Sequence, residues 1–207
     1  MLFSPGLYLP MGKRPAAASV ASTTWNPADS GASFILTNGN LTATATNPPF
    51  SALGGRTVAG KSAGKYYFEI HIDSFTSGNI QVGIATSTWD EDSTMLNTTV
   101  GAIIRSDGVG GYNSSNFGSG LTFVTGDVFG VAVDFTNSKI WFRQNGGSWD
   151  GTTDDPATNT GGTSIAGFAT PAFACAWLNG ANTIAVTARF ASGSWGFAAP
   201  SGFGQWG

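Results

Sequence analysis

The sequence contains few side chains that could catalyse a reaction. Its 207 residues include one histidine, His71, and one cysteine, Cys175. Cys175 lies in the apolar run Ala172–Trp177, where a small buried thiol is the expected role. His71 alternates with Tyr67 and Glu69 along an expected strand, so we interpret it as structural. No nucleophile-elbow, zinc-protease or nucleotide-binding motif occurs, and we expect neither enzymatic activity nor a cofactor or bound metal.

Two tryptophans stand beside acidic side chains in expected loops. Sugars have apolar faces that stack on aromatic rings and hydroxyls that hydrogen-bond to polar groups, so an indole flanked by acids suits a glycan site. The alternative is that each indole packs against the end of the core. The two sets are Trp89 with Asp90, Glu91 and Asp92, and Trp149 with Asp150, Asp154 and Asp155.

A third loop combines aromatic and polar residues. It runs from Tyr112 to Phe117 and resembles antibody binding loops in composition, although Tyr112 also suits a structural role. The candidate ligand-binding residues are therefore Trp89, Asp90, Asp92, Tyr112, Asn113, Asn116, Trp149, Asp150, Asp154 and Asp155.

The elements that must position these loops have the pattern of β-structure. From Trp25 onward, short apolar runs alternate with clusters of Gly, Asn, Asp, Ser and Pro, and no window of eleven residues has helical periodicity. Asn38-Gly39 and Asn145-Gly146 are tight-hairpin signals. We predict an all-β, two-sheet antiparallel sandwich with strands at 34–36, 41–45, 65–72, 80–85, 101–104, 128–135, 139–143, 173–178 and 183–190.

Composition excludes several other classes of protein. Charged residues make up 10% of the chain, against about 25% in an average soluble domain. The 15 Phe and 7 Trp argue against disorder, and the net charge of −3 argues against a nucleic-acid partner. No apolar stretch approaches the length of a membrane span, so we expect no membrane insertion.

Residues 1–20 differ from the rest and are expected to form an N-terminal arm, with the sandwich domain over 21–207. Lys13 and Arg14 follow the apolar part of the arm, the reverse of the order in a secretory signal, so we predict no signal peptide. The arm is either a loose terminus or an anchor that docks on a partner through its large apolar side chains, which are Leu2, Phe3, Leu7, Tyr8 and Leu9.

Five motifs, in order along the chain, resemble those of the SPRY (B30.2-like) domain family. They are Gly64–Ile70, Val82–Ala85, Gly111–Tyr112, Gly126–Phe135 and Lys139–Gly146. The resemblance implies a concanavalin A-like jelly roll that recognises ligands through loops and is mostly non-catalytic. The remaining motifs are similar to SPRY-type modules of phage structural proteins, and these are Asp155–Thr158, Gly161–Gly162, Pro171–Ala172 and Trp195–Phe203.

The resemblance implies a binding module on the surface of a phage or phage-derived particle, such as a head or tail spike or fibre. Its expected partners are host surface glycan and, through the arm, other virion proteins. A homo-oligomer is expected by analogy, because weak sites gain avidity when presented together. The alternatives are a structural decoration or adaptor of the virion without an external ligand, and a protein-binding SPRY module.

Clustered carboxylates can also bind calcium. We expect the loop acids at positions 90–92 and 154–155 to be solvated instead. Chelation with EDTA should therefore leave the melting temperature of the purified protein unchanged. A large decrease in that temperature would instead identify a structural cation.

Overall fold

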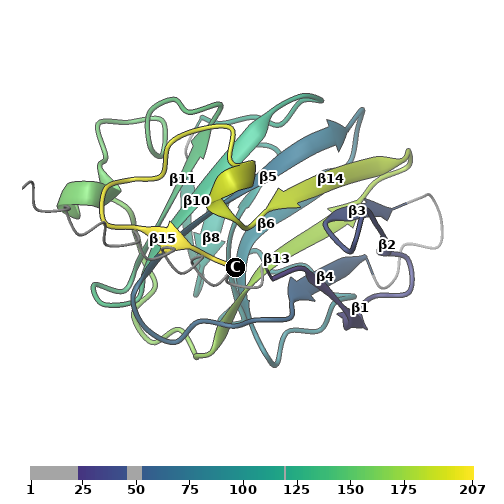
Figure 1. Ribbon diagram of the computed structural model, residues 1–207, viewed down its shortest axis with the longest axis horizontal. Coiled ribbons are helices and arrows are strands. Elements are labelled where there is room, and N and C mark those ends of the chain that lie inside the picture. Colours follow the sequence, from purple (N-terminus) through teal and green to yellow (C-terminus); the bar gives the residue numbers. More distant parts are fainter. Residues whose placement is uncertain (1–22, 46–52, 119) are drawn as a thin grey trace, which may run out of the picture.

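The computed structural model describes residues 23–45, 53–118 and 120–207, which form two sheets packed face to face (Figure 1). The sheets are antiparallel, as predicted, and the described residues contain no α-helix. The first sheet has the order β1 (Trp25–Ser30), β4 (Gly54–Thr57), β13 (Ala172–Asn179), β6 (Asn79–Thr86), β7 (Gly101–Arg105), β8 (Val109–Tyr112), β9 (Ser115–Gly118). The second has the order β12 (Thr163–Ser164), β11 (Lys139–Gln144), β10 (Val128–Asp134), β5 (Lys65–Ser74), β14 (Ile184–Arg189), β3 (Thr42–Ala45), β2 (Ile35–Thr37).

Three short elements complete the fold. A strand near the C-terminus, β15 (Gly204–Gln205), pairs in parallel with β5. Two 3-10 helices, η1 (Pro156–Thr158) and η2 (Ser192–Ser194), interrupt the long loops. None of the helices in the described part of the chain has the length and hydropathy needed to cross a membrane.

Both predicted Asn-Gly pairs form turns, but only Asn38-Gly39 makes a hairpin between two paired strands. Asn38 and Gly39 have φ of 51° and 62°, and Asn145 and Gly146 have φ of 51° and 70°. These left-handed conformations suit Asn and Gly, and in the first turn they match the twist of the flanking strands. The first turn joins β2 to β3, and the second follows β11, which pairs with β10 over six residue pairs. Strands β1, β4, β8, β9, β12 and β15 were not predicted, because their short or Gly-rich sequences lack alternation.

The apolar core lies between the two sheets. Phe68, Ile70 and Ile72 of β5 point into it with no exposed surface, and Val82 and Ile84 of β6 belong to the same cluster. Each such side chain contributes about 1.5–3 kcal/mol when fully buried. Cys175 is also fully buried, as predicted.

The outer face of the second sheet is buried as well. Tyr67 and Glu69, which alternate with the core residues of β5, have no exposed surface. The C-terminal segment 190–203 covers them before it returns as β15. Aromatic side chains fill the space in a second cluster formed by Tyr67, Ala132, Trp141, Trp149 and Phe203, with Trp195 and Ala199 beside it.

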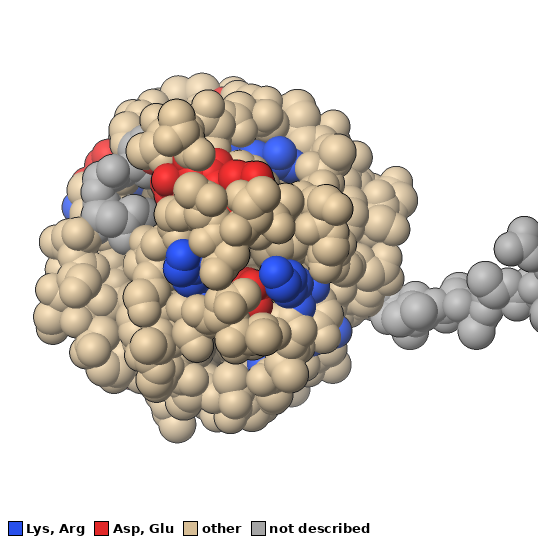
Figure 2. Space-filling view, turned by 90° about the vertical axis from the view of Figure 1, so that its left-hand side faces the viewer, with Lys and Arg blue, Asp and Glu red and all other residues tan. Residues whose placement is uncertain are grey.

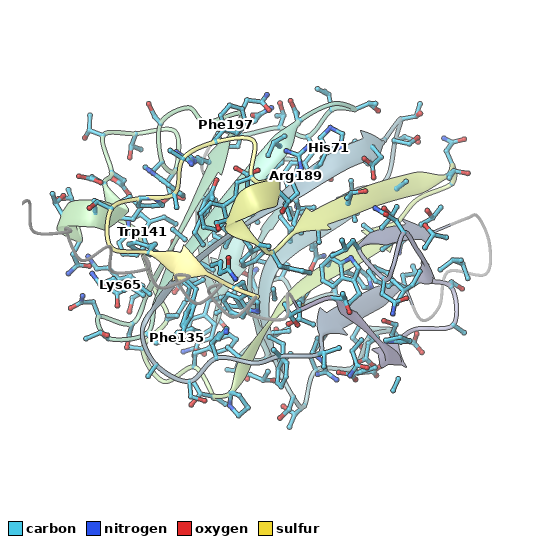
Figure 3. The ribbon with its side chains drawn as sticks, viewed as in Figure 1. Lys65, His71, Phe135, Trp141, Arg189 and Phe197 are labelled. Atoms are coloured by element: carbon cyan, nitrogen blue, oxygen red, sulfur yellow. The ribbon has the colours of Figure 1, made fainter. Side chains whose placement is uncertain are left out.

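A buried carboxylate holds this C-terminal segment in place. Glu69 accepts hydrogen bonds from the backbone N–H of Gly196 at 2.6 Å and of Phe197 at 2.9 Å. The hydroxyl of Tyr67 donates to it at 2.8 Å, and Arg189 forms an ion pair with it at 3.4 Å. Arg189 and Phe197 can be followed on this face of the sheet in Figure 3. Glu69 thus links the middle of the segment, and Arg189 just before it, to the central part of the sheet.

The outer face of the first sheet is covered by the loop 87–98. Gln81 lies on the opposite face of β6 from Val82, and its amide donates to Thr94 Oγ1 at 2.7 Å while its oxygen accepts from Met95 N at 2.9 Å. Met95 Sδ lies 3.4 Å from Cys175 Sγ. Both sheets are therefore covered on the side away from the core.

Removing the Glu69 carboxylate should destabilise the domain strongly. Glu69→Ala leaves two backbone N–H groups, the buried Tyr67 hydroxyl and the Arg189 guanidinium without this carboxylate partner, and we expect the free energy of unfolding to fall by about 3 kcal/mol or more. Urea denaturation measures this change. The control is Asp107→Ala, because the Asp107 side chain is half exposed and pairs with Arg105, so its loss should be below about 1 kcal/mol. Equal losses in the two variants would contradict this role of Glu69.

Candidate binding site

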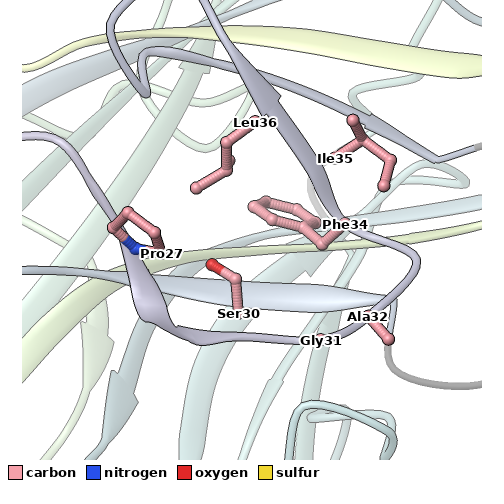
Figure 4. Close-up of a pocket in the computed structure, with 7 residues that line it drawn as sticks. All are labelled: Pro27, Ser30, Gly31, Ala32, Phe34, Ile35 and Leu36. Atoms are coloured by element: carbon pink, nitrogen blue, oxygen red, sulfur yellow. The ribbon is translucent and has the colours of Figure 1, made fainter.

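An apolar hollow lies between the edges of the two sheets (Figure 4). Strand β1 ends the first sheet and β2 ends the second, and the chain passes from one to the other through residues 31–34. The hollow has a volume of about 280 Å³, and no charged side chain lines it. Its lining consists of Pro27, Ser30, Gly31, Ala32, Phe34, Ile35 and Leu36.

Phe34 forms the buried floor of the hollow. Its ring meets that of Trp25 edge-on with centroids 5.7 Å apart. The ring lies against the bare backbone of Gly55, where a Cβ atom would come within 2.6 Å of Phe34 Cε1. Ile35, on the rim, is 50% exposed. The hollow therefore offers a fixed aromatic floor and an exposed aliphatic rim, which together favour an apolar ligand group.

The two strands that flank the hollow have free edges. Among the described residues, β1 pairs with β4 on one side and β2 pairs with β3 on one side, and neither has a strand on the other side. An edge strand presents N–H and C=O groups that can pair with an extended chain. The hollow thus combines an apolar cavity with the backbone groups that a bound peptide would use.

An ion network around the buried Arg56 fixes the β1 wall of the hollow. Arg56 of β4 is 5% exposed and donates to both carboxylate oxygens of Asp29 in β1, at 2.8 and 2.5 Å. It also donates to Glu91 at 2.6 Å and to the carbonyl oxygens of Thr86 and Trp89. Hydrogen bonding from Arg56 lowers the pKa of Asp29, whereas burial raises the pKa of Glu91. Arg56 therefore ties β1 to the loop that covers the first sheet.

The two tryptophans proposed for sugar stacking are both buried. Trp89 is 3% exposed, and its indole N–H donates to the carbonyl oxygen of Ser93 at 2.9 Å. Trp149 is 8% exposed, lies edge-on to Tyr67 at 6.2 Å and has Arg143 4.5 Å above its ring. Neither indole presents a face to solvent on which a sugar could stack. Both rings instead pack against the sandwich, which is the alternative given by the sequence analysis.

The acidic residues near Trp89 serve local structure. Asp90 accepts a hydrogen bond from Asp92 N at 3.1 Å, and both of these acids are exposed. Glu91 belongs to the Arg56 network. These residues lie over the first sheet.

The acidic residues near Trp149 lie over the second sheet, on the opposite side of the sandwich, so the structure does not bring the two sets together. Asp155 caps η1 by accepting from Ala157 N at 3.0 Å, Asp154 accepts from Gly162 N at 2.7 Å, and Asp150 is buried. No group of three or more His, Cys, Asp or Glu side chains in 23–45, 53–118 and 120–207 is placed to hold a metal ion.

The third predicted loop forms an exposed hairpin between β8 and β9. Asn113 and Ser114 adopt φ of 48° and 63°, and their N–H groups donate to the carbonyl oxygens of Thr98 and Asn97. The side chains of Asn113 and Asn116 are exposed. Tyr112 is only 6% exposed and contacts Phe168, so it is structural.

Two further sets of residues differ from what the sequence predicted or could not be compared with it. The five apolar residues of the predicted anchor, Leu2, Phe3, Leu7, Tyr8 and Leu9, lie outside the described residues. The residues of the hollow were not identified from the sequence, because β1 has no strand alternation and the hollow exists only where two sheet edges meet.

Truncating Trp89 should destabilise the fold because its ring fills space over the first sheet, next to Gly54. We expect Trp89→Ala to lower the free energy of unfolding by about 3–5 kcal/mol, measured by urea denaturation. Asp90→Ala removes an exposed neighbour and should change it by no more than about 0.5 kcal/mol. A Trp89→Ala protein as stable as the wild type would show that the indole is not a packing residue.

One face of the molecule is mostly uncharged, with a few separate groups of acidic and basic side chains spread over it (Figure 2). The low charge of the sequence is thus visible on this face as well. Such a surface has little long-range electrostatic attraction for ligands. Specificity on it must come from shape, apolar contact and neutral hydrogen-bonding groups.

Comparison with solved structures shows the same fold in three other proteins. The SPRY domain of human HERC1 matches with a TM-score of 0.61 and 17% identity, covering 80% of this chain and 96% of that one. The TRIM65 PSpry domain matches with a TM-score of 0.58 and 15% identity, covering 81% and 91%. The stonustoxin structure matches with a TM-score of 0.55 and 17% identity, covering 81% of this chain and 27% of that one. At such low sequence identity, these matches show a shared fold and not a shared function.

Comparison of the sequence with curated proteins finds no match. None of these three matches is to a phage protein by name. The resemblance to SPRY-type modules of phage structural proteins, inferred from the sequence, therefore stays a prediction. The model of the SPRY domain family matches residues 65–184, which is more than half of the sequence. The chain therefore belongs to the SPRY domain family.

Proposed function

We propose that this protein is a non-enzymatic recognition module that binds a short extended segment of a partner protein at the hollow between β1 and β2. SPRY domains are typically protein-binding modules. The observation that carries the proposal is the combination of an apolar hollow of about 280 Å³ with two strand edges that have no strand beside them in the described residues.

The size of the hollow sets the kind of ligand. Sites for drug-sized molecules usually measure about 300–1,000 Å³, and this hollow lies just below that range, so it suits one or two side chains of a larger ligand. A peptide strand along the edge of β2 would place alternate side chains toward Phe34 and Ile35. Burial of apolar area would supply the affinity, and backbone pairing would supply the orientation.

The arrangement of nucleophilic groups supports a function without catalysis. Burial raises the pKa of the Cys175 thiol far above its ordinary value, which keeps it protonated. His71 Nδ1 lies 2.6 Å from Asp73 Oδ1, and Thr187 donates to the other oxygen of Asp73. The Thr187 hydroxyl therefore hydrogen-bonds to the Asp73 carboxylate and not to the His71 imidazole. His71 is thus not placed to activate this hydroxyl as a nucleophile.

A second candidate function is glycan attachment at the β8–β9 hairpin, as expected for a module on a virion surface. The exposed amides of Asn113 and Asn116 favour it, because their neighbours Ser114 and Ser115 are also exposed and the hairpin backbone is fixed by bonds to Thr98 and Asn97. Neutral amides and hydroxyls are suitable hydrogen-bonding partners for sugar hydroxyls. No exposed indole accompanies them, since Trp89 and Trp149 are buried.

A display library of random peptides and a glycan array, both applied to the purified protein, distinguish the two functions. We expect peptides with large apolar residues to be enriched, and Ile35→Asp to weaken their binding by about tenfold or more because a charge then stands at the apolar rim. The matched control is Val124→Asp, since Val124 is 56% exposed and lies away from the hollow.

Two outcomes would contradict the peptide proposal. One is enriched peptides that bind the Ile35→Asp and Val124→Asp proteins equally well. The other is binding to arrayed glycans, with no peptide enrichment, that is lost in an Asn113→Ala, Asn116→Ala double variant. The second result would establish the hairpin as the site.

A further inference from the structure

The loop 149–162 contains a buried carboxyl group pinned to β11. Asp150 is 9% exposed, and its Oδ1 accepts a hydrogen bond from Phe142 N at 2.9 Å, while its own N–H donates to Phe142 O at 2.6 Å. Its φ of 49° is left-handed and is followed by Gly151 at 67°. Asp is among the few residue types besides Gly that adopt this conformation readily, and the two hydrogen bonds with Phe142 hold Asp150 in it.

The second oxygen of Asp150 is buried and accepts no hydrogen bond. The carboxyl group of Asp154 lies next to it, because the chain returns through a bridge between Trp149 and Asp154. Asp154 is itself fixed by Gly162 N, which donates to its Oδ2 at 2.7 Å. Gly161 passes so close that a Cβ there would lie 2.0 Å from Asp154 Cγ. Two carboxyl groups are thus held together with one oxygen unsatisfied.

The cations and acids around this pair bond to other groups. Arg143 of β11 donates to the Tyr67 hydroxyl at 2.9 Å and to the carbonyl oxygen of Ala198 at 2.5 Å. Lys139, also of β11, donates to the carbonyl oxygen of Asn159 at 3.0 Å. Asp155 caps η1. Glu69 of β5 binds the C-terminal segment. Among the described residues, Asp150 is buried without a cation partner, so a negative charge on it beside the Asp154 carboxylate is costly, which favours a proton held between the two groups.

We propose that Asp150 and Asp154 share one proton, and that this carboxylic acid–carboxylate pair is a pH-sensitive latch that holds the loop 149–162 on the outer face of the second sheet. The proton lies on Asp150 Oδ2 and is donated to the Asp154 carboxylate. A proton fits better than a metal ion, because the described residues place only these two acids together and no group of three.

The latch secures contacts that cover the second sheet. Trp149 packs on Tyr67, and the indole N–H of Trp141 donates to the carbonyl oxygen of Thr160 at 3.0 Å. Loss of the shared proton leaves two adjacent carboxylates that repel each other. The loop 149–162 is then bound less strongly to the outer face of the second sheet.

The direction of the pH dependence follows from the pKa of Asp150. Burial, and the neighbouring Asp154, raise this pKa from 3.8 to about 7. Between these two values the folded protein binds the proton and the unfolded chain does not, so stability falls as pH rises from about 4 to about 7 and is constant above. Glu91 contributes with the same sign and Asp29 with the opposite sign, but both are present in all the variants compared below.

Melting temperatures at pH 5 and pH 8 test the latch. We expect the wild type to lose about 5 °C more between these pH values than Asp150→Asn does. Asn supplies the same Oδ1 acceptor, an N–H donor in place of the shared proton, and tolerance of positive φ. Asp154→Asn should have the same effect, because its amide can donate to Asp150. The control Asp155→Asn retains the capping oxygen and should behave as the wild type.

The proposal is overturned if both Asp150→Asn and Asp154→Asn keep the pH dependence of the wild type. It is also overturned if millimolar Ca²⁺ at pH 8 restores the melting temperature of the wild type but not of Asp150→Asn, since a cation would then neutralise the pair. If one variant fails to fold, the other still decides the question.

Discussion

The buried carboxylate of Glu69 is the interaction on which the arrangement of this domain depends. It accepts the N–H groups of Gly196 and Phe197, which are 127 and 128 residues away in the sequence. These bonds hold the C-terminal segment on the outer face of the second sheet and make β5 a strand that is buried on both sides. The loop around Trp149 then packs against the same aromatic cluster. A carboxylate that satisfies several buried donors at once is costly to remove, so the covering layer depends on one side chain.

Arg56 has the corresponding role on the first sheet. Its guanidinium joins Asp29 of β1, Glu91 of the loop 87–98 and two backbone carbonyl oxygens. In both networks, charged side chains bind other parts of the same chain. Although only 10% of the residues are charged, Glu69 and Arg56 are therefore buried. Because both outer faces are occupied by the protein's own loops, the surfaces left for a partner are the sheet edges and the exposed hairpins. The hollow beside β1 and β2, where we propose that a partner binds, is one of these edges.

Local patterns predicted much of the fold. The Asn-Gly turns, the strand β10 and the alternation in β5 depend on neighbouring residues, and the structure confirms them. The exposure of Trp89 and Trp149 could not be predicted in the same way, because it depends on which distant segments cover them. The acids beside these indoles suggested a glycan site, yet Glu91 pairs with Arg56, Asp155 caps η1, and Asp150 and Asp154 lie together. The hollow requires the edges of two sheets to meet, and no single stretch of sequence encodes that.

In the proposed mode of binding, recognition uses the edge of the sandwich, because the protein's own segments cover both sheet faces. Chemical-shift perturbation of the isotopically labelled protein, titrated with a peptide selected for binding, tests this directly. We expect the largest chemical-shift changes at residues 27–36 and at their neighbours in β3 and β4. Changes confined to residues 113–116, or to the loop 87–98, with none at 27–36, would contradict it.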